Sequence, residues 1–326
     1  MSIDLMDLQA KYDAVWPQPP RVPPPVSEVA KLPPPLFRSP PALRVIASDA
    51  GWLPECVRAG KPTLFMHLAG HFRSFALNAA HLRAFLDASS SCWFVVLFTL
   101  EFAEQRSPPW WCRLYDRVQR PTCLESAARA ANTSVTAAHV REAALPLLHG
   151  TPNHGGLAFA VAARGHEPAI SDTAVLQNAA AAAALSRSVL AQHRFVPHDT
   201  DIILHSRPDI MYSAAIDFAH LHRLSRRSAL PLLLLLRHGG TAGYEGVNWN
   251  DPSDVAWVAS RAAYDRLCPV RTSCLGARSA GELKRRSCGH AYASLFVHAA
   301  APLGVRSLYV HTHADSSSYM LQLPSG

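Results

Sequence analysis

Compact runs of hydrophobic residues alternate with segments of helical periodicity along most of the chain. The hydrophobic runs predict five buried strands, at residues 61–70, 92–101, 200–213, 229–236 and 304–311. The helical segments are predicted at 71–88, within 125–148, and at 171–195, 251–268 and 280–301. Continuously apolar strands separated by helices indicate an α/β fold, with a mostly parallel sheet that helices cover on both faces.

The beginning of the chain follows a different pattern. Residues 17–41 contain 11 of the 26 prolines, and proline cannot donate the backbone hydrogen bonds that helices and sheets require. We therefore predict a proline-rich tail or linker, poorly ordered, over residues 1–42. The remainder, residues 43–326, is predicted to form a single domain.

The net charge changes this picture little. The formal charge is +7, but only four of the 31 basic residues are lysine, and the two basic runs, at 222–228 and 283–288, are short. Such runs are typical of solvated helix faces, so a nucleic-acid partner is not predicted.

The chain offers no obvious membrane segment. Its longest apolar run, at 229–236, is far shorter than the ~20 residues that a spanning helix needs. The first 16 residues carry acidic positions and lack the apolar core of a signal peptide. We expect no transmembrane segment and a cytoplasmic protein by default; the expectation becomes a secretory lumen if the N-terminus is incomplete.

The seven cysteines include no Cys-x-x-Cys pair, so neither a zinc site nor a redox dithiol is indicated. Most are expected to be buried free thiols. In an oxidising compartment, a loop disulfide could form between Cys112 and Cys123, or between two of Cys268, Cys274 and Cys288.

Polar residues follow several predicted strands, and ligands bind beyond the carboxyl ends of strands in open α/β sheets. Gly70, His71 and Arg73 follow the first strong strand and open a helix. The free N–H groups and the dipole of a helix N-terminus favour an anion, and Arg73 could add a bidentate contact to phosphate. The alternative is an ordinary turn with an exposed cation.

The segment Arg207-Pro208-Asp209 ends another predicted strand. Proline fixes its own φ and disfavours helix at Arg207, so the strand ladder stops where these side chains emerge. Asp209 could bind a divalent cation or a hydroxyl group. The alternative is that Arg207 and Asp209 form an ion pair that only caps the strand.

These motifs resemble a loosely defined group of GT-A-type glycosyltransferase-like proteins, of algae and large DNA viruses, that use nucleotide sugars. The matching motifs are Gly-x-x-Arg-Ser-Phe at 70–75, Arg-Pro-Asp at 207–209 and Asn-Asp before a predicted helix at 250–251. The likeness spans roughly residues 62–310 and implies a GT-A-like, Rossmann-like fold. It departs from the common GT-A pattern at Arg207, which stands in place of the first Asp of Asp-x-Asp.

The resemblance implies a transferase that moves a sugar from a nucleotide-diphosphate donor to a glycan, protein or lipid acceptor. It assigns nucleotide-sugar binding to five residues: Gly70, His71, Arg73, Arg207 and Asp209. It assigns catalysis to Asp209 and to Asp251, which would take the proton of the acceptor hydroxyl. Asp251 before Pro252 is also typical of a helix start.

The same resemblance implies a divalent metal ion, Mn or Mg, held by Asp209 together with His311 and His313. The arginine at position 207 weakens the case for this metal. Without the first Asp, a catalytically inactive nucleotide- or sugar-binding module of the same fold is the main alternative.

A less favoured alternative is a metal-dependent hydrolase. The residues His311, His313 and Asp315 match the beginning of a metallo-β-lactamase-like motif, and two imidazoles at this spacing suit a metal. That family continues with another histidine, whereas Ser316 follows here.

Overall fold

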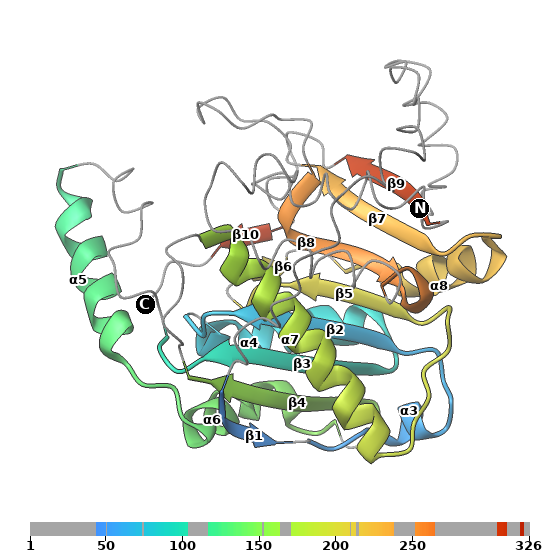
Figure 1. The fold of residues 1–326 in the computed structure, drawn as a ribbon, viewed down its shortest axis with the longest axis horizontal. Helices are drawn as coiled ribbons and strands as arrows, with labels where there is room; N and C mark the ends of the chain where they lie inside the picture. Colours follow the sequence, from blue (N-terminus) through green and yellow to red (C-terminus); the bar gives the residue numbers. More distant parts are fainter. Residues whose placement is uncertain are drawn as a thin grey trace, which may run out of the picture.

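An eight-stranded sheet forms the centre of the molecule (Figure 1), in the order β1-β4-β3-β2-β5-β8-β7-β9. The computed structural model describes residues 44–49, 51–73, 75–103, 117–151, 153–163, 171–208, 210–212, 215–237, 252–264, 305–311 and 320–322. The strands of this sheet are β1 Val45–Asp49, β2 Leu64–Gly70, β3 Trp93–Leu100, β4 Gly155–Ala162, β5 Ile202–Ser206, β7 Leu232–Arg237, β8 Pro252–Ser260 and β9 Arg306–His311. A separate two-stranded sheet pairs β6 Ile210–Tyr212 with β10 Met320–Gln322.

Most strands of the large sheet run in one direction. β4, β3, β2 and β5 pair in parallel, as do β7 and β9. β8 is antiparallel to both β5 and β7, and β1 is antiparallel to β4. The predicted α/β fold with a mostly parallel sheet is therefore confirmed.

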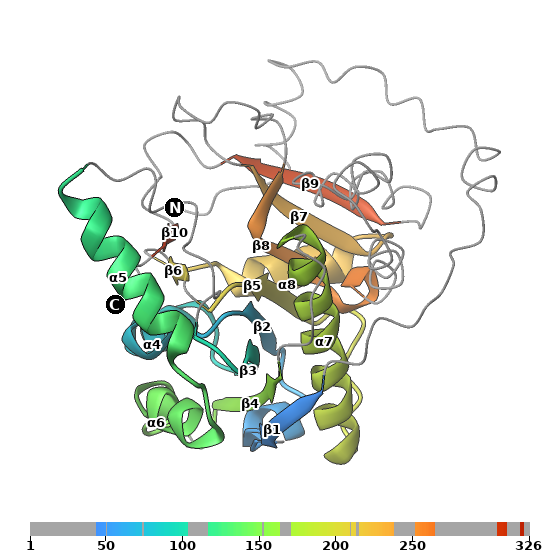
Figure 2. The ribbon, with the colours of Figure 1, turned by 60° about the vertical axis from the view of Figure 1, so that its left-hand side comes forward.

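Helices cover both faces of the sheet. The described helices are α3 Glu55–Arg58, α4 Phe75–Ser89, α5 Gln119–Asn132, α6 Ala137–Leu148, α7 Ser171–Gln192 and α8 Phe218–Arg227. Figure 2 shows α7 on one side of the sheet and α4 and α6 on the other. None of the helices in the described part of the chain is long and apolar enough to cross a membrane.

Strand β2 shows why the pattern gives this layered structure. Its residues are buried on both faces up to Gly70, so it reads as a continuous apolar run. Leu64 and Met66 join the large core on the α4 side. Ala69 joins a smaller core with Phe98 and Ala182 under α7.

The prediction of a helix at 251–268 was wrong, because residues 252–260 form strand β8, and of the described residues in this range only 261–264 are helical. Residues Ala256 to Ser260 are buried between β5 and β7, so an apolar run suited to either element became a central strand. The third motif of the resemblance therefore lacks its expected helix, and the interpretation of Asp251 as a helix N-cap is wrong. Asp251 itself lies outside the described residues.

Three strands, β1, β4 and β10, were not predicted. β4 is rich in glycine and alanine, which have weak strand propensity. Close packing requires glycine at two of its positions. A Cβ at Gly155 would lie 2.2 Å from the ring of Trp93, and one at Gly156 would lie 2.4 Å from the carbonyl oxygen of Trp52. The strand therefore depends on tertiary contacts that a propensity argument does not contain.

The other predicted elements have mixed outcomes. Helix α7 confirms the prediction at 171–195, and the span 125–148 contains parts of two helices, the second capped by the Thr136 hydroxyl, which accepts from His139 N at 3.2 Å. The predicted tail at 1–42 and the predicted helix at 280–301 lie outside the described residues.

A disulfide joins Cys56 at the start of α3 to Cys92 before β3, with the Cα atoms 5.9 Å apart. This corrects the expectation of free thiols at these positions. Cys123 is also disulfide-bonded, whereas Cys112 and the three later cysteines lie outside the described residues.

We expect peptide mapping of the unreduced protein to recover a Cys56–Cys92 crosslink. Because this bond closes a loop with a sequence separation of 36, its loss in the double variant Cys56→Ala/Cys92→Ala should lower the free energy of unfolding by about 3–4 kcal/mol. Urea unfolding of the two oxidised proteins measures the difference. Ready alkylation of both thiols in the native protein would contradict the bond.

Candidate functional site

The candidate site lies at the carboxyl ends of β2 and β5, which are parallel neighbours in the sheet (Figure 1). The chain passes from β2 to β3 on one side of β2, whereas β5 lies on the other side. The order of strands thus reverses between β2 and β5, and such a switch point is where open α/β sheets bind ligands. Both polar motifs predicted from the sequence lie at this point.

Gly70 is the last residue of β2 and has φ of 138°, a conformation that residues with a Cβ rarely adopt. A Cβ at Gly70 would lie 3.7 Å from Cδ of Pro208. The turn after β2 and the turn after β5 are therefore in direct proximity. We call these two turns, residues 70–73 and 207–208, the strand-end corner.

The turn after β2 is held by the segment that follows β3. The backbone N–H of Arg73 donates to the carbonyl oxygen of Ala103 at 2.9 Å, and Nδ1 of His71 lies 3.4 Å from the carbonyl oxygen of Phe102. Arg73 has φ of 37°, which is uncommon for a residue with a side chain. α4 begins two residues later, and the backbone N–H of its first residue, Phe75, donates to the carbonyl oxygen of Phe72 at 2.9 Å.

The turn after β5 is held from two sides. Asn78 of α4 is 2% exposed, and its Nδ2 donates to the carbonyl oxygen of Ile210 and, at 3.5 Å, approaches that of Pro208. On the other side, the ring of His205 stacks on Trp257 of β8, with centroids 5.0 Å apart and an interplanar angle of 18°. These contacts fix the backbone from which Arg207 emerges.

Asn78 is a site residue that the sequence reasoning missed. It occupies a buried position on α4 among Phe75, Ala79 and Leu82, where a helical pattern predicts an apolar residue. A polar residue at an apolar position was the available signal. Its contacts with Pro208 and Ile210 could not be foreseen without the pairing of β2 with β5.

The structure thus brings together four of the predicted site residues: Gly70, His71, Arg73 and Arg207. Asp209, Asp251, His313 and Asp315 lie outside the described residues. Pro252, which follows Asp251, pairs with Arg237 at the carboxyl end of β7. The described neighbour of Asp251 is therefore at the same edge of the sheet as the corner.

His311, the last residue of β9, also pairs with Arg237. β9 lies three strands from β5 in the sheet, which is about 14 Å at ordinary strand spacing. Within the part of the chain that the structure describes, no group of three or more His, Cys, Asp or Glu side chains is placed to hold a metal ion. Of the predicted metal ligands, Asp209 and His313 lie outside the described residues, and His311 is described only by its position in β9.

No protein-family model matches this chain, and no curated protein matches it at significant similarity. Its function is therefore inferred from the geometry of its own residues.

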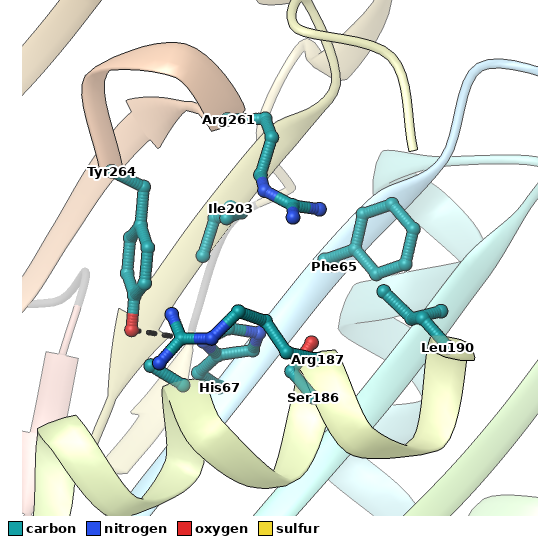
Figure 3. Close-up of a pocket in the computed structure, with 9 residues that line it drawn as sticks. Phe65, His67, Ser186, Arg187, Leu190, Ile203, Arg261 and Tyr264 are labelled. Atoms are coloured by element: carbon teal, nitrogen blue, oxygen red, sulfur yellow. Dashed lines mark hydrogen bonds between the residues drawn. The ribbon is translucent and has the colours of Figure 1, made fainter. Parts of the chain in front are cut away.

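A second group of polar side chains lies on the α7 face of the sheet (Figure 3). Nδ1 of His67 in β2 lies 3.1 Å from the hydroxyl oxygen of Tyr264. Tyr264 stacks on Trp257, with centroids 5.2 Å apart. Trp257 in turn stacks on His205, which is the strand partner of His67. A chain of aromatic contacts thus connects the corner with the interior of the α7 face.

Asp201 precedes β5 at the opposite edge of the sheet and is 1% exposed. The backbone N–H of His198 donates to its Oδ2 at 2.9 Å. Burial is the main cause that raises the pKa of Asp201 to about 6, from an ordinary value of 3.8, and the contacts with His198 and Arg261 only partly oppose it. The folded protein therefore disfavours the charged form of this carboxyl.

The raised pKa makes stability depend on pH in a defined direction. Asp201 stabilises the folded state most when protonated, below about pH 4, and this contribution is lost as the pH rises through 6. Between pH 4 and 7 the free energy of unfolding of Asp201→Asn should rise by about 2 kcal/mol relative to wild type. Urea unfolding at each pH measures this difference.

The matched control is Asp199→Asn, which removes an exposed carboxyl two residues away. A difference between Asp201→Asn and wild type that stays constant from pH 4 to 7 would contradict the raised pKa.

Proposed function

We propose that this protein is a GT-A-like glycosyltransferase that transfers a sugar from a nucleotide-diphosphate donor to an acceptor hydroxyl. The observation that carries the proposal is the contact at the strand-end corner. A Cβ at Gly70 would lie 3.7 Å from Pro208, so two motifs more than 130 residues apart meet at the switch point of the sheet. Nucleotides bind at this place in open α/β sheets.

The charge of the corner suits a diphosphate. Arg73 and Arg207 supply guanidinium groups, which can bind phosphate oxygens in a bidentate manner. The backbone N–H groups at the start of α4 add a further preference for negative charge. A leaving nucleoside diphosphate gains negative charge as the glycosidic bond breaks, so groups placed here would stabilise the transition state.

Carboxylates supply the remaining chemistry of the proposal. Asp251 would accept the proton of the acceptor hydroxyl in an inverting reaction. Asp209 would bind either the donor sugar or a metal ion. The donor set does not fit a metal site well, because a cation, Arg207, occupies the position of the first carboxylate. We therefore assign neutralisation of the diphosphate to the arginines and draw no step through a metal.

The second candidate is a binding module of the same fold that has lost catalysis. Arg207 is the observation that favours it, since it replaces a carboxylate on which related enzymes depend. Both candidates predict nucleotide binding at the corner. Only the enzyme predicts transfer or hydrolysis of a nucleotide sugar that Asp251→Ala abolishes while binding persists.

Calorimetric titration with UDP and GDP, with and without manganese, tests the binding that both candidates require. We expect one of the nucleotides to bind at a single site. Gly70→Val should weaken it at least tenfold, about 1.4 kcal/mol, because the valine cannot adopt the turn easily and projects toward Pro208. Asn78→Ala should also weaken it, since the backbone around Pro208 loses its support. Asp209→Ala should weaken it if that carboxylate contacts the donor.

Leu77→Ala is the matched control, because Leu77 is the exposed neighbour of Asn78 on α4 and should leave affinity within twofold. Circular dichroism establishes that each variant is folded. The proposed site would be refuted if neither nucleotide bound to the wild type. It would also be refuted if Gly70→Val and Asn78→Ala both bound the nucleotide with the affinity of the wild type.

A further inference from the structure

We propose that the α7 face carries a second ligand site, which binds an oxyanion of the phosphate type between Arg187 and Arg261. The site is a small hollow between α7, β2, β5 and the turn after β8 (Figure 3). Nothing in the proposed transfer reaction uses these residues. The hollow is separate from the strand-end corner. Pro252, at the start of β8, lies at the same edge of the sheet as the corner, whereas Arg261 follows the other end of β8.

The first reason is the charge around the hollow. Arg187 comes from α7 and Arg261 from the turn after β8, and Figure 3 shows both side chains extending across the hollow. The residues that line the hollow include no aspartate or glutamate. The two guanidinium groups come from distant parts of the chain, and an anion in the hollow would interact favourably with both.

The second reason is the set of neutral donors beside the arginines. The Ser186 hydroxyl and the bonded pair of His67 and Tyr264 face the same hollow. All three residues are buried, with Phe65 and Leu190 as apolar lining. Hydrogen bonds and charge interactions are stronger in such surroundings than in water.

The size of the hollow defines how the anion would fit. Its volume is about 10 Å³. A single water molecule needs about 10–15 Å³ when volume is measured in the same way. This is room for one oxygen atom, not for a whole phosphate. One oxygen would therefore enter toward Ser186 and Tyr264, and the others would meet Arg187, which is exposed at the mouth.

Asp201 supplies an opposing charge near Arg261. Its carbonyl oxygen accepts from the backbone N–H of Arg261 at 2.7 Å, and its carboxyl interacts electrostatically with Arg261. Part of the positive charge of Arg261 is thus already balanced. Arg187 is expected to make the larger contribution to anion affinity.

Both free inorganic phosphate and the phosphoryl group of a small phosphomonoester have this chemistry. Calorimetric titration of the full chain with inorganic phosphate and with methyl phosphate, at constant ionic strength, separates these two sources. We expect saturable binding at one site. Equal affinity for both would identify a monoester as an acceptable ligand, and binding of inorganic phosphate alone would identify the free ion.

Three variants test the residues. Arg187→Gln should weaken binding at least tenfold, and Arg261→Gln should also weaken it. The matched control is Arg223→Gln, which removes an exposed arginine on α8 and should change the affinity by less than twofold. Binding of UDP to Arg187→Gln should equal that of the wild type, so the two sites can fail independently.

Absence of saturable phosphate binding would overturn the site, as would unchanged affinity in Arg187→Gln. Loss of phosphate binding in Gly70→Val with full retention in Arg187→Gln would assign the ion to the strand-end corner and would equally overturn it.

Discussion

The parallel pairing of β2 with β5 is the constraint on which the candidate site depends. It places the turn after Gly70 against Pro208, although the two are distant in the chain. Neither turn alone would bind a diphosphate selectively, because a glycine turn and an arginine after a strand are common features. Their proximity at the switch point, with the start of α4 beside them, supports the proposed site, which would combine a helix N-terminus with two cations.

The surroundings of the corner make its geometry rigid. α4 contributes Asn78, which holds the backbone after β5, and β8 contributes Trp257, which stacks on His205. The antiparallel β8 is thus not incidental to the site, because it supports β5 on the side away from β2. Groups held in this way need little rearrangement when charge develops on a ligand, which is the basis of electrostatic catalysis.

The sequence predicted most of the parallel strands, but not β4, for reasons that particular elements make clear. β2, β3 and β5 are continuous apolar runs with polar residues directly after two of them, so both the strands and the candidate residues Gly70, Arg73 and Arg207 could be found. β8 was taken for a helix, because burial on both faces removes the alternation that distinguishes a strand. β4 was not predicted because its glycines answer to tertiary contacts, Gly155 with the ring of Trp93 and Gly156 with the carbonyl oxygen of Trp52, which only the folded chain contains. The contribution of Asn78, the disulfide of Cys56 with Cys92 and the hollow lined by both Arg187 and Arg261 likewise depend on which elements become neighbours.

The central claim is that the strand-end corner binds the diphosphate of a nucleotide. A crystal structure of the protein with bound UDP tests it most directly. We predict that the diphosphate lies against the backbone of residues 70–73, within hydrogen-bonding distance of Arg73 or Arg207. A nucleotide bound elsewhere, with this corner empty, would contradict the account.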